Sequence, residues 1–153
     1  TLSAVRAAGA EALDDLLRFL VVEFYCRHRN VLPELDVKKA TAVIHRTLRD
    51  GHVFVVEDEH GDIVGSLGLL KTDAAWFSGE QVLSDPWFYV LPSYRKGTRA
   101  AVDLLQAAIA VADEQRVRLS MAVVTAENVD LKHQFFRRHG FVHLGGVYER
   151  RVQ

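Results

Sequence analysis

The apolar residues in the first fifty positions recur with the period of an α-helix. A short strand over residues 2–6 is followed by apolar positions three or four apart, which predict an amphipathic helix: Leu13, Leu16, Leu17, Leu20 and Phe24. A second helix is expected after Asp36, because aspartate is a frequent N-cap, and it ends at Gly51, since glycine often closes a helix.

The pattern changes after Gly51 to that of strands. Residues 52–57 and 63–70 are both rich in β-branched and aliphatic side chains, and the polar stretch 58–62 between them has the composition of a hairpin turn. Gly65 and Gly68 in the second strand indicate a bulge or a close approach of another group. Residues 72–80 are expected to form a loop, and 87–91 an aromatic-rich strand.

The last third of the sequence alternates between the two periods. Apolar positions from Ala101 to Ala112 predict a third helix, and residues 119–124 predict a strand covered on both faces. A fourth helix begins at Glu127 or Asn128 and is closed by Gly140, and two strands follow over 141–144 and 147–152. This order predicts an α/β fold in which helices flank one mixed sheet.

Length and composition favour one domain over residues 1–153. The chain has 19 Lys and Arg against 20 Asp and Glu, so it lacks the basic excess that general nucleic-acid or membrane-surface binders usually show. Cys26 is the single cysteine, which excludes an intrachain disulfide and fits a cytoplasmic setting. The start of the sequence lacks the charged and apolar regions of a signal peptide, and no apolar run is long enough to cross a bilayer.

The most informative segment joins the strand at 87–91 to the third helix. The backbone N–H groups that begin a helix have no intrahelical acceptor, and with the helix dipole they form an anion site. Gly97 allows a ligand to approach the backbone closely, because it has no Cβ. Three cations, Arg95, Lys96 and Arg99, surround the same turn. The sequence therefore predicts a phosphate site, with solvated charges at a helix start as the alternative.

These residues resemble the GNAT superfamily of acetyl-coenzyme A-dependent N-acetyltransferases. Residues 90–101 look like its strand, turn and helix motif, and residues 128–141, from Asn128 to Gly140-Phe141, look like its second signature. The order of elements agrees over nearly the whole chain. The resemblance implies a mostly antiparallel mixed sheet, transfer of an acetyl group to a primary amine by direct attack, and acetyl-coenzyme A as cosubstrate.

The turn departs from the family pattern by about one residue. The usual order is Arg or Gln, two residues, Gly, one residue, then Gly or Ala. Arg95 in the first position places Thr98 where glycine is expected, with Ala100 in the last position, whereas Gly97 in the glycine position makes Tyr94 the first residue and Arg99 the last. Both alignments remain open.

The resemblance also implies which residues bind the cofactor. Pantetheine is expected to pair with the backbone of residues 88–91, and the asparagine that opens the fourth helix, here Asn128, is expected to reach toward it or to act as an N-cap. The implied cofactor site comprises Phe88, Tyr89, Val90, Leu91, Arg95, Lys96, Gly97, Thr98, Arg99, Ala100, Asn128 and Phe135.

The catalytic groups are less well defined. Many family members carry a tyrosine as general acid where this chain has Phe136, so Tyr148, Tyr94 or water is left for that role. Asp85 is the first base candidate and Glu80 the second, although Asp85-Pro86 is also typical of turn initiation. Glu23 is a third base candidate, or a group that holds a cationic acceptor.

The remaining predictions concern metal, acceptor and assembly. His139 and His143 have a metal-ligand spacing, but Gly140 separates them, so no metal is predicted. Acceptor specificity is expected to come from the first two helices, residues 26–35 and the loop at 72–83, and Trp76, Phe77 and Trp87 either line the acceptor pocket or belong to the core. The acceptor is expected to be a small-molecule or protein amine, and a homodimer is expected because GNAT-like proteins often pair. A catalytically silent acyl-coenzyme A-binding domain is the alternative function.

Overall fold

The computed structural model describes residues 1–123 and 127–152. The chain divides into two compact units, Thr1–Ala122 and Val123–Gln153, and each is described by itself. The prediction of a single domain over residues 1–153 is not tested by this division. Within the described residues, no helix combines the length and the apolar character that crossing a membrane requires.

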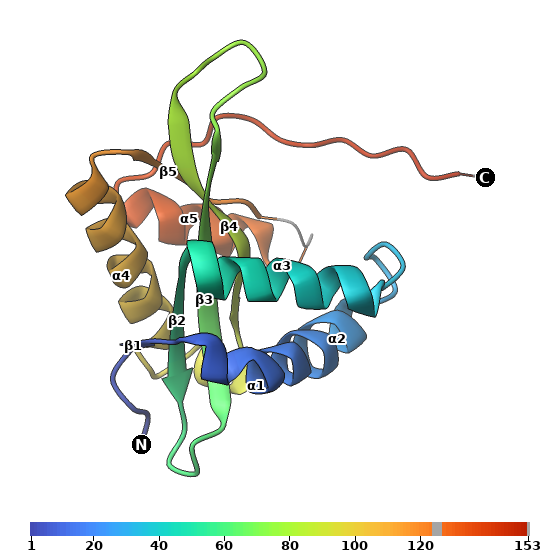
Figure 1. Cartoon of the computed structure of the whole chain (residues 1–153), viewed down its shortest axis with the longest axis vertical. Helices are drawn as coiled ribbons and strands as arrows, with labels where there is room; N and C mark the ends of the chain where they lie inside the picture. Colours follow the sequence, from blue (N-terminus) through green and yellow to red (C-terminus); the bar gives the residue numbers. More distant parts are fainter. Residues whose placement is uncertain (124–126, 153) are drawn as a thin grey trace. The chain divides into compact units, whose positions relative to one another are not determined.

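The first unit contains a five-stranded sheet in the order β1-β2-β3-β4-β5 (Figure 1). Its neighbouring strands are antiparallel except β4 and β5, which are parallel. The predicted mixed, mostly antiparallel sheet is therefore confirmed. The strands are β1 (Arg6–Ala7), β2 (His52–Glu57), β3 (Ile63–Asp73), β4 (Gln81–Val90) and β5 (Arg118–Ser120).

The helices of this unit lie on both faces of the sheet (Figure 1). The predicted first helix is a continuous run of four helical segments: the 3-10 helix η1 (Ala10–Ala12), α1 (Leu13–Arg18), the π-helical η2 (Phe19–Tyr25) and α2 (Cys26–His28). The second is α3 (Val37–Asp50), and the Asp36 carboxylate accepts the Lys39 N–H at 3.0 Å, which confirms the predicted cap. A short η3 (Pro92–Tyr94) precedes α4 (Ala100–Gln115).

Two apolar clusters hold these layers together. On one face, Val56 and Val64 pack with the buried side of α4, including Leu104. On the other, Val53 and Val55 pack with α1, η2 and α3. Because side chains of a strand alternate between faces, β2 supplies both clusters and is fixed in register by them.

Gly68 marks a close approach, as its position in the sequence indicates. The buried Trp87 donates its indole N–H to the Ser66 hydroxyl at 2.9 Å, and that hydroxyl donates to the Phe54 carbonyl at 2.9 Å. A Cβ on Gly68 would lie 2.8 Å from the Trp87 ring. Trp87 is therefore a core residue, and of the two predicted roles the structure assigns it the structural one.

We expect Gly68→Ala to lower the free energy of unfolding by about 1–3 kcal/mol, because the indole must move to admit the methyl group. Urea denaturation measures the change. Gly79→Ala is the matched control, since its Cβ would meet no atom within 4 Å and the position does not have positive φ. Equal stability of the two variants would contradict the packing described for Trp87.

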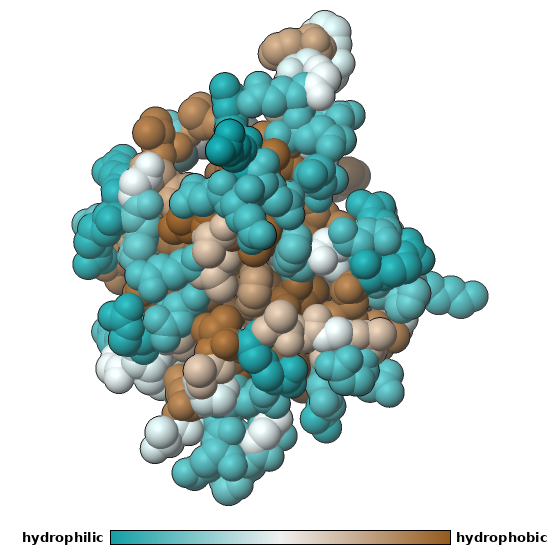
Figure 2. Space-filling view, turned by 60° about the vertical axis from the view of Figure 1, so that its left-hand side comes forward, coloured by the Kyte–Doolittle hydropathy of each residue, from teal (hydrophilic) through white to brown (hydrophobic). Residues whose placement is uncertain are grey.

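Three strands differ in extent from the prediction. β3 extends to Asp73 and β4 begins at Gln81, so the loop is confined to residues 74–80. The tip of this hairpin forms a narrow projection (Figure 2). The tip residues Trp76 and Phe77 are 96% and 75% exposed, so neither belongs to the core. β5 covers only Arg118–Ser120, two of whose three residues are exposed, so the strand predicted over 119–124 ends early and is not covered on both faces. Residue 124 lies outside the described residues.

The second unit contains α5 (Val129–Arg138), which confirms the predicted fourth helix. The strands predicted over 141–144 and 147–152 are wrong, because the described residues after Gly140 have no regular secondary structure. Leu144, Val147 and Val152 are almost fully exposed. An isolated pair of short strands is marginally stable, and the glycines at 145 and 146 contribute no side chains to hold it.

Candidate functional site

The most distinctive feature of the sheet is the short contact between β4 and β5. These parallel strands pair only from Val82 to Ser84 with residues 118–120. The β3–β4 register then shifts between Gly68 and Leu70, so that Asp85 and Pro86 together lie opposite Leu69. This is the arrangement of a β-bulge, a position that tolerates the missing N–H of proline. The predicted turn at Asp85-Pro86 is therefore wrong, and the pair lies inside β4.

Asp85 lies where the two parallel strands separate. Its carboxylate accepts the Ala122 N–H at 3.1 Å, just after the end of β5. Burial raises the pKa of Asp85 to about 7, although hydrogen bonds from the Ala122 and Asp85 backbone N–H groups partly oppose that increase. A carboxylate with a pKa near neutrality is suited to accept a proton at physiological pH.

The other two base candidates lie elsewhere in the first unit. Glu80 is exposed at the start of β4, and its carboxylate is 3.1 Å from the Arg118 guanidinium. Glu23 is on η2 and lies 3.3 Å from the Arg27 guanidinium. The structure therefore brings neither Glu80 nor Glu23 to the point where β4 leaves β5, and Asp85 is the carboxylate found there.

Beyond the bulge, the backbone of β4 has two distinct edges. The Leu91 N–H donates to the Val64 carbonyl at 2.9 Å, so in an antiparallel ladder Tyr89 also directs its polar groups to β3. Phe88 and Val90 consequently direct theirs to the opposite edge. β5 does not extend along this edge, because its pairing ends at Ser84. The residues predicted to pair with pantetheine thus include two, Phe88 and Val90, whose backbone faces the β5 side of β4 beyond the end of the β5 pairing.

The turn between β4 and α4 is open around Gly97. Gly97 has φ of 76°, and a Cβ there would meet no atom within 4 Å. The Thr98 hydroxyl donates to the Tyr94 carbonyl and accepts the Ala100 N–H at 3.3 Å. No described residue accepts the N–H groups of residues 101 and 102, so the front of α4 is closed only in part by the protein's own side chains.

The three cations of this turn are held differently. Arg95 donates from Nε to the Val90 carbonyl at 2.8 Å and places its guanidinium 5.2 Å from the centre of the Tyr89 ring. Arg99 lies 3.4 Å from the Asp103 carboxylate. Lys96 is exposed, and no described residue forms an ion pair with it. From the sequence, all three cations are expected near one anion, whereas in the structure the Arg95 side chain lies along β4.

Two cavities adjoin this turn. The first, of about 400 Å³, is lined by residues 1–3 and Val56 and by the start of α4 with its turn: Tyr94, Gly97, Thr98, Arg99, Ala100 and Asp103. The contribution of residues 1–3 carries no recognisable sequence signal. The cavity does not reach Phe88, Tyr89 or Val90.

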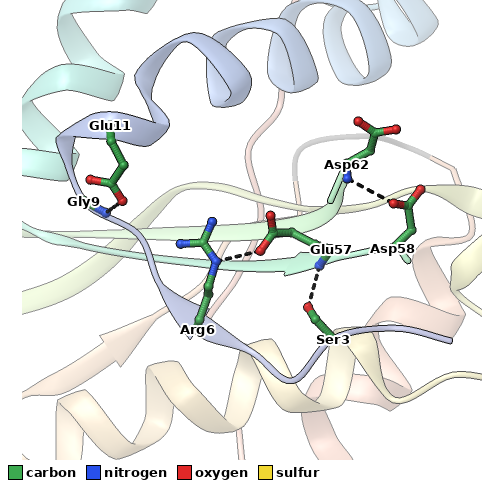
Figure 3. A network of polar contacts seen from close by, with 7 residues as sticks. All are labelled: Ser3, Arg6, Gly9, Glu11, Glu57, Asp58 and Asp62. Atoms are coloured by element: carbon green, nitrogen blue, oxygen red, sulfur yellow. Dashed lines mark hydrogen bonds and ion pairs between the residues drawn. The ribbon is translucent and has the colours of Figure 1, made fainter. Parts of the chain in front are cut away.

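A polar network holds the N-terminal segment beside this cavity (Figure 3). The Ser3 hydroxyl accepts the Glu57 N–H at 2.9 Å, and the Arg6 guanidinium donates to the Glu57 carboxylate at 2.6 Å. That hydrogen bond raises the pKa of Arg6. The wall formed by residues 1–3 is therefore attached to β2 at two points.

The second cavity, of about 380 Å³, lies between α1, η2 and the β2–β3 turn and includes Leu91 and Tyr94. Four of its residues are acidic: Asp15, Glu23, Asp58 and Asp62. The Asp58 carboxylate accepts the N–H of Asp62 (Figure 3) and that of His60, and these hydrogen bonds lower the pKa of Asp58. These hydrogen bonds within the turn give Asp58 a structural role.

The site residues of the second unit are described within that unit alone. Asn128 precedes α5 with φ of 53°, and its side chain makes no capping hydrogen bond, so the predicted N-cap bond is absent. Phe135 and Phe136 stack edge to face at 5.5 Å between ring centres, and Phe136 also contacts Phe141. Tyr148 is fully exposed. In the described part of the chain, no three His, Cys, Asp or Glu side chains gather as metal ligands would.

Solved acetyltransferase structures share this fold. The aminoglycoside acetyltransferase AAC(6')-Iy, in complex with a bisubstrate analogue, is 16% identical with a TM-score of 0.70, and the match covers 100% of this chain and 99% of that one. A predicted acetyltransferase from Clostridium acetobutylicum with acetyl-CoA is 14% identical with a TM-score of 0.74, covering 99% and 96%. The aminoglycoside acetyltransferase meta-AAC0020 from an uncultured soil sample is 15% identical with a TM-score of 0.69, covering 99% and 95%.

The sequence itself carries the family assignment. No functionally curated protein matches the chain. The model of the acetyltransferase (GNAT) domain, however, matches residues 49–143, which include β2, the bulge in β4, the turn at Gly97 and α5. The chain therefore belongs to the GNAT acetyltransferase family.

Proposed function

We propose that this protein transfers an acetyl group from acetyl-coenzyme A to a primary amine of a small molecule, by direct attack in a ternary complex. One observation carries the proposal: β4 and β5 pair over three residues and then separate, with Asp85 at the point of separation. Beyond Ser84 the edge of β4 is no longer paired with β5, which is where an extended cosubstrate is proposed to bind, with a proton acceptor beside one end of it.

The residues of the turn fit a diphosphate. Gly97 adopts a positive φ beside open space, and the N–H groups at the front of α4 point out of the helix with its positive dipole. Lys96 adds an exposed cation. Arg95 has another proposed role, because its bond to the Val90 carbonyl fixes the end of the strand that leads into the turn.

The spacing along β4 suits a cosubstrate bound at both ends. The turn begins after Leu91, and Asp85 lies six residues earlier, which corresponds to roughly 20 Å of extended strand. The diphosphate is thus placed at the turn and the thioester near Asp85. Phe88 and Val90 are the proposed backbone partners of the arm between them.

Asp85 is proposed as the general base. A neutral amine must attack the thioester carbonyl, forming the C–N bond, while the C–S bond breaks and the thiolate leaves. Asp85, directly or through water, accepts the proton that the amine loses. A thiol has an unperturbed pKa of about 8.5, so the departing thiolate does not need a strong acid, and water is the proposed proton donor.

The small-molecule acceptor is supported by the complexes of structural neighbours. The AAC(6')-Iy structure holds an analogue that joins coenzyme A to an acetylneamine, and another meta-AAC0020 structure holds sisomicin. We place the reacting amine of this protein near Asp85. The acidic cavity beside Tyr94 lies at the opposite end of β4, and we assign it no role in the reaction.

Coenzyme A is expected to raise the melting temperature by several degrees at a concentration about 100 times its Kd, since binding to the native state adds about 2.7 kcal/mol. Differential scanning fluorimetry measures the shift, with adenosine and inorganic pyrophosphate as separate ligands. A larger shift with another nucleotide than with coenzyme A would contradict the proposed cosubstrate.

A second candidate function is supported by Phe136, which occupies the position where many family members have the tyrosine acid. The protein would then bind acyl-coenzyme A without turnover. Incubation with acetyl-coenzyme A and a panel of amines distinguishes the two functions through release of free thiol. Binding without thiol release for every amine would favour the silent domain.

A further inference from the structure

Along the distal half of the β3–β4 hairpin, no described strand pairs with the outer edge of β3. β2 begins at His52 opposite Leu69, so β3 from Leu70 to Asp73 extends beyond its neighbour on that side (Figure 1). The exposed Trp76 and Phe77 lie just past this edge, with ring centres 5.5 Å apart. An exposed strand edge is a template for pairing with another chain.

The hydrogen-bond pattern identifies which residues face outward. The Ala74 N–H donates to the Glu80 carbonyl at 2.8 Å, and β3 and β4 pair through Thr72 with Val82. Because backbone direction alternates along a strand, Thr72 faces β4, whereas Lys71 and Asp73 direct their N–H and C=O groups away from it. Among the described residues, nothing accepts from or donates to those outward groups.

This edge is complementary to itself. In an antiparallel pair of two identical edges, a two-fold axis at Thr72 places Lys71 of each copy opposite Asp73 of the other. Both residues direct their backbone groups outward, so each pair can exchange two hydrogen bonds, and each joins opposite charges on one face of the sheet. A two-fold axis at Lys71 would instead place the Lys71 side chains of the two copies opposite each other. It would also pair Asp73 of one copy with Leu69 of the other, and β2 already pairs with Leu69.

We infer that two copies of this chain associate through the β3 edge, with the two-fold axis at Thr72. In this register the hairpin tip of one copy reaches the level of Leu69 of the other, where β2 begins, and its two aromatic side chains become buried. Four such side chains bury about 600–1,000 Å². With the two strand edges added, the interface lies at the lower end of the range for specific complexes.

The inference does not depend on the proposed activity and is tested by charge reversal. Sedimentation velocity at about 100 µM should show a dimer for the wild type and weaker association, by about 10-fold or more, for both Lys71→Asp and Asp73→Lys, because each change places like charges opposite one another. Lys38→Asp, on the exposed side of α3, is the matched control for the change in net charge.

The decisive measurement mixes the two weakened variants. A heterodimer of Lys71→Asp with Asp73→Lys restores two opposite-charge pairs in this register, so an equimolar mixture should recover the dimer that neither variant forms alone. A monomeric wild type would overturn the inference, since the edge is then covered by another segment or left open. Dimers that persist in both single variants, or a mixture that stays monomeric, would overturn it as well.

Discussion

Asp85→Asn is expected to lower kcat for amine acetylation by about 10²–10⁴-fold, because asparagine keeps the shape of the side chain but cannot accept the proton of the attacking amine. Its amide oxygen can still accept the Ala122 N–H that the carboxylate accepts in the native protein at 3.1 Å. Steady-state thiol release with a saturating acceptor measures kcat, and the KM for acetyl-coenzyme A should change little. An unchanged kcat would remove Asp85 from the reaction.

The pH dependence of this variant separates chemistry from folding. Asp85 must be ionised to accept a proton, so kcat/KM of the wild type should rise as pH increases through about 7, and that inflection should disappear in Asp85→Asn. Glu80→Gln is the control, because this exposed carboxylate pairs with Arg118 instead. Loss of the inflection in the control would contradict the assignment.

The raised pKa of Asp85 also predicts how the stability of the protein changes with pH. This pKa rises from 3.8 to about 7 on folding, so the native state holds a proton that the unfolded state has lost between these values. The free energy of unfolding of the wild type should therefore fall as pH rises from 4 to 7. Asp85→Asn should melt higher than the wild type at pH 8, and the advantage should disappear near pH 4.

Gly97→Glu is expected to weaken coenzyme A binding by about 100-fold or more. The substitution adds a negative charge where the diphosphate is proposed to lie and imposes a side chain on a residue with φ of 76°. A Cβ there meets no atom within 4 Å, so the backbone cost should be limited to about 1–2 kcal/mol. Isothermal titration calorimetry measures the affinity.

Gly61→Glu is the matched control for that backbone cost. Gly61 has φ of 81° in the β2–β3 turn and equally open surroundings, but it lies outside the proposed diphosphate site. Both variants should lose similar stability, while only Gly97→Glu should lose affinity for coenzyme A. Similar affinities in the two variants would show that the diphosphate does not bind at this turn.

Several features could be predicted from the sequence because they depend on neighbours along the chain. The Asp36 cap forms within one helical turn, and the hairpin turn around Asp58 forms through hydrogen bonds from residues two and four positions later. The strand, turn and helix around Gly97 also lie within one short segment, so their residue types and spacing indicate the phosphate site directly.

Other features depend on partners distant in sequence. Asp85-Pro86 has local turn chemistry, but pairing with β3 and β5 holds it inside a strand as a bulge. The charge of Arg95 predicts phosphate binding, whereas the fold offers it the Val90 carbonyl and the Tyr89 ring. The strands predicted after Gly140 do not form among the described residues, for the converse reason. Their residues have β propensity, but a strand is stable only when a neighbouring strand pairs with it.

The sequence by itself thus determined the family, the main helices and the turn at Gly97, because local propensity and motif spacing are properties of short segments. Only the tertiary structure decided that Asp85 is a partly buried group with a raised pKa and that no described strand pairs with the outer edge of β3 beyond Leu69. Burial and strand pairing are set by residues that folding brings together from distant parts of the chain, such as Asp85 and Ala122.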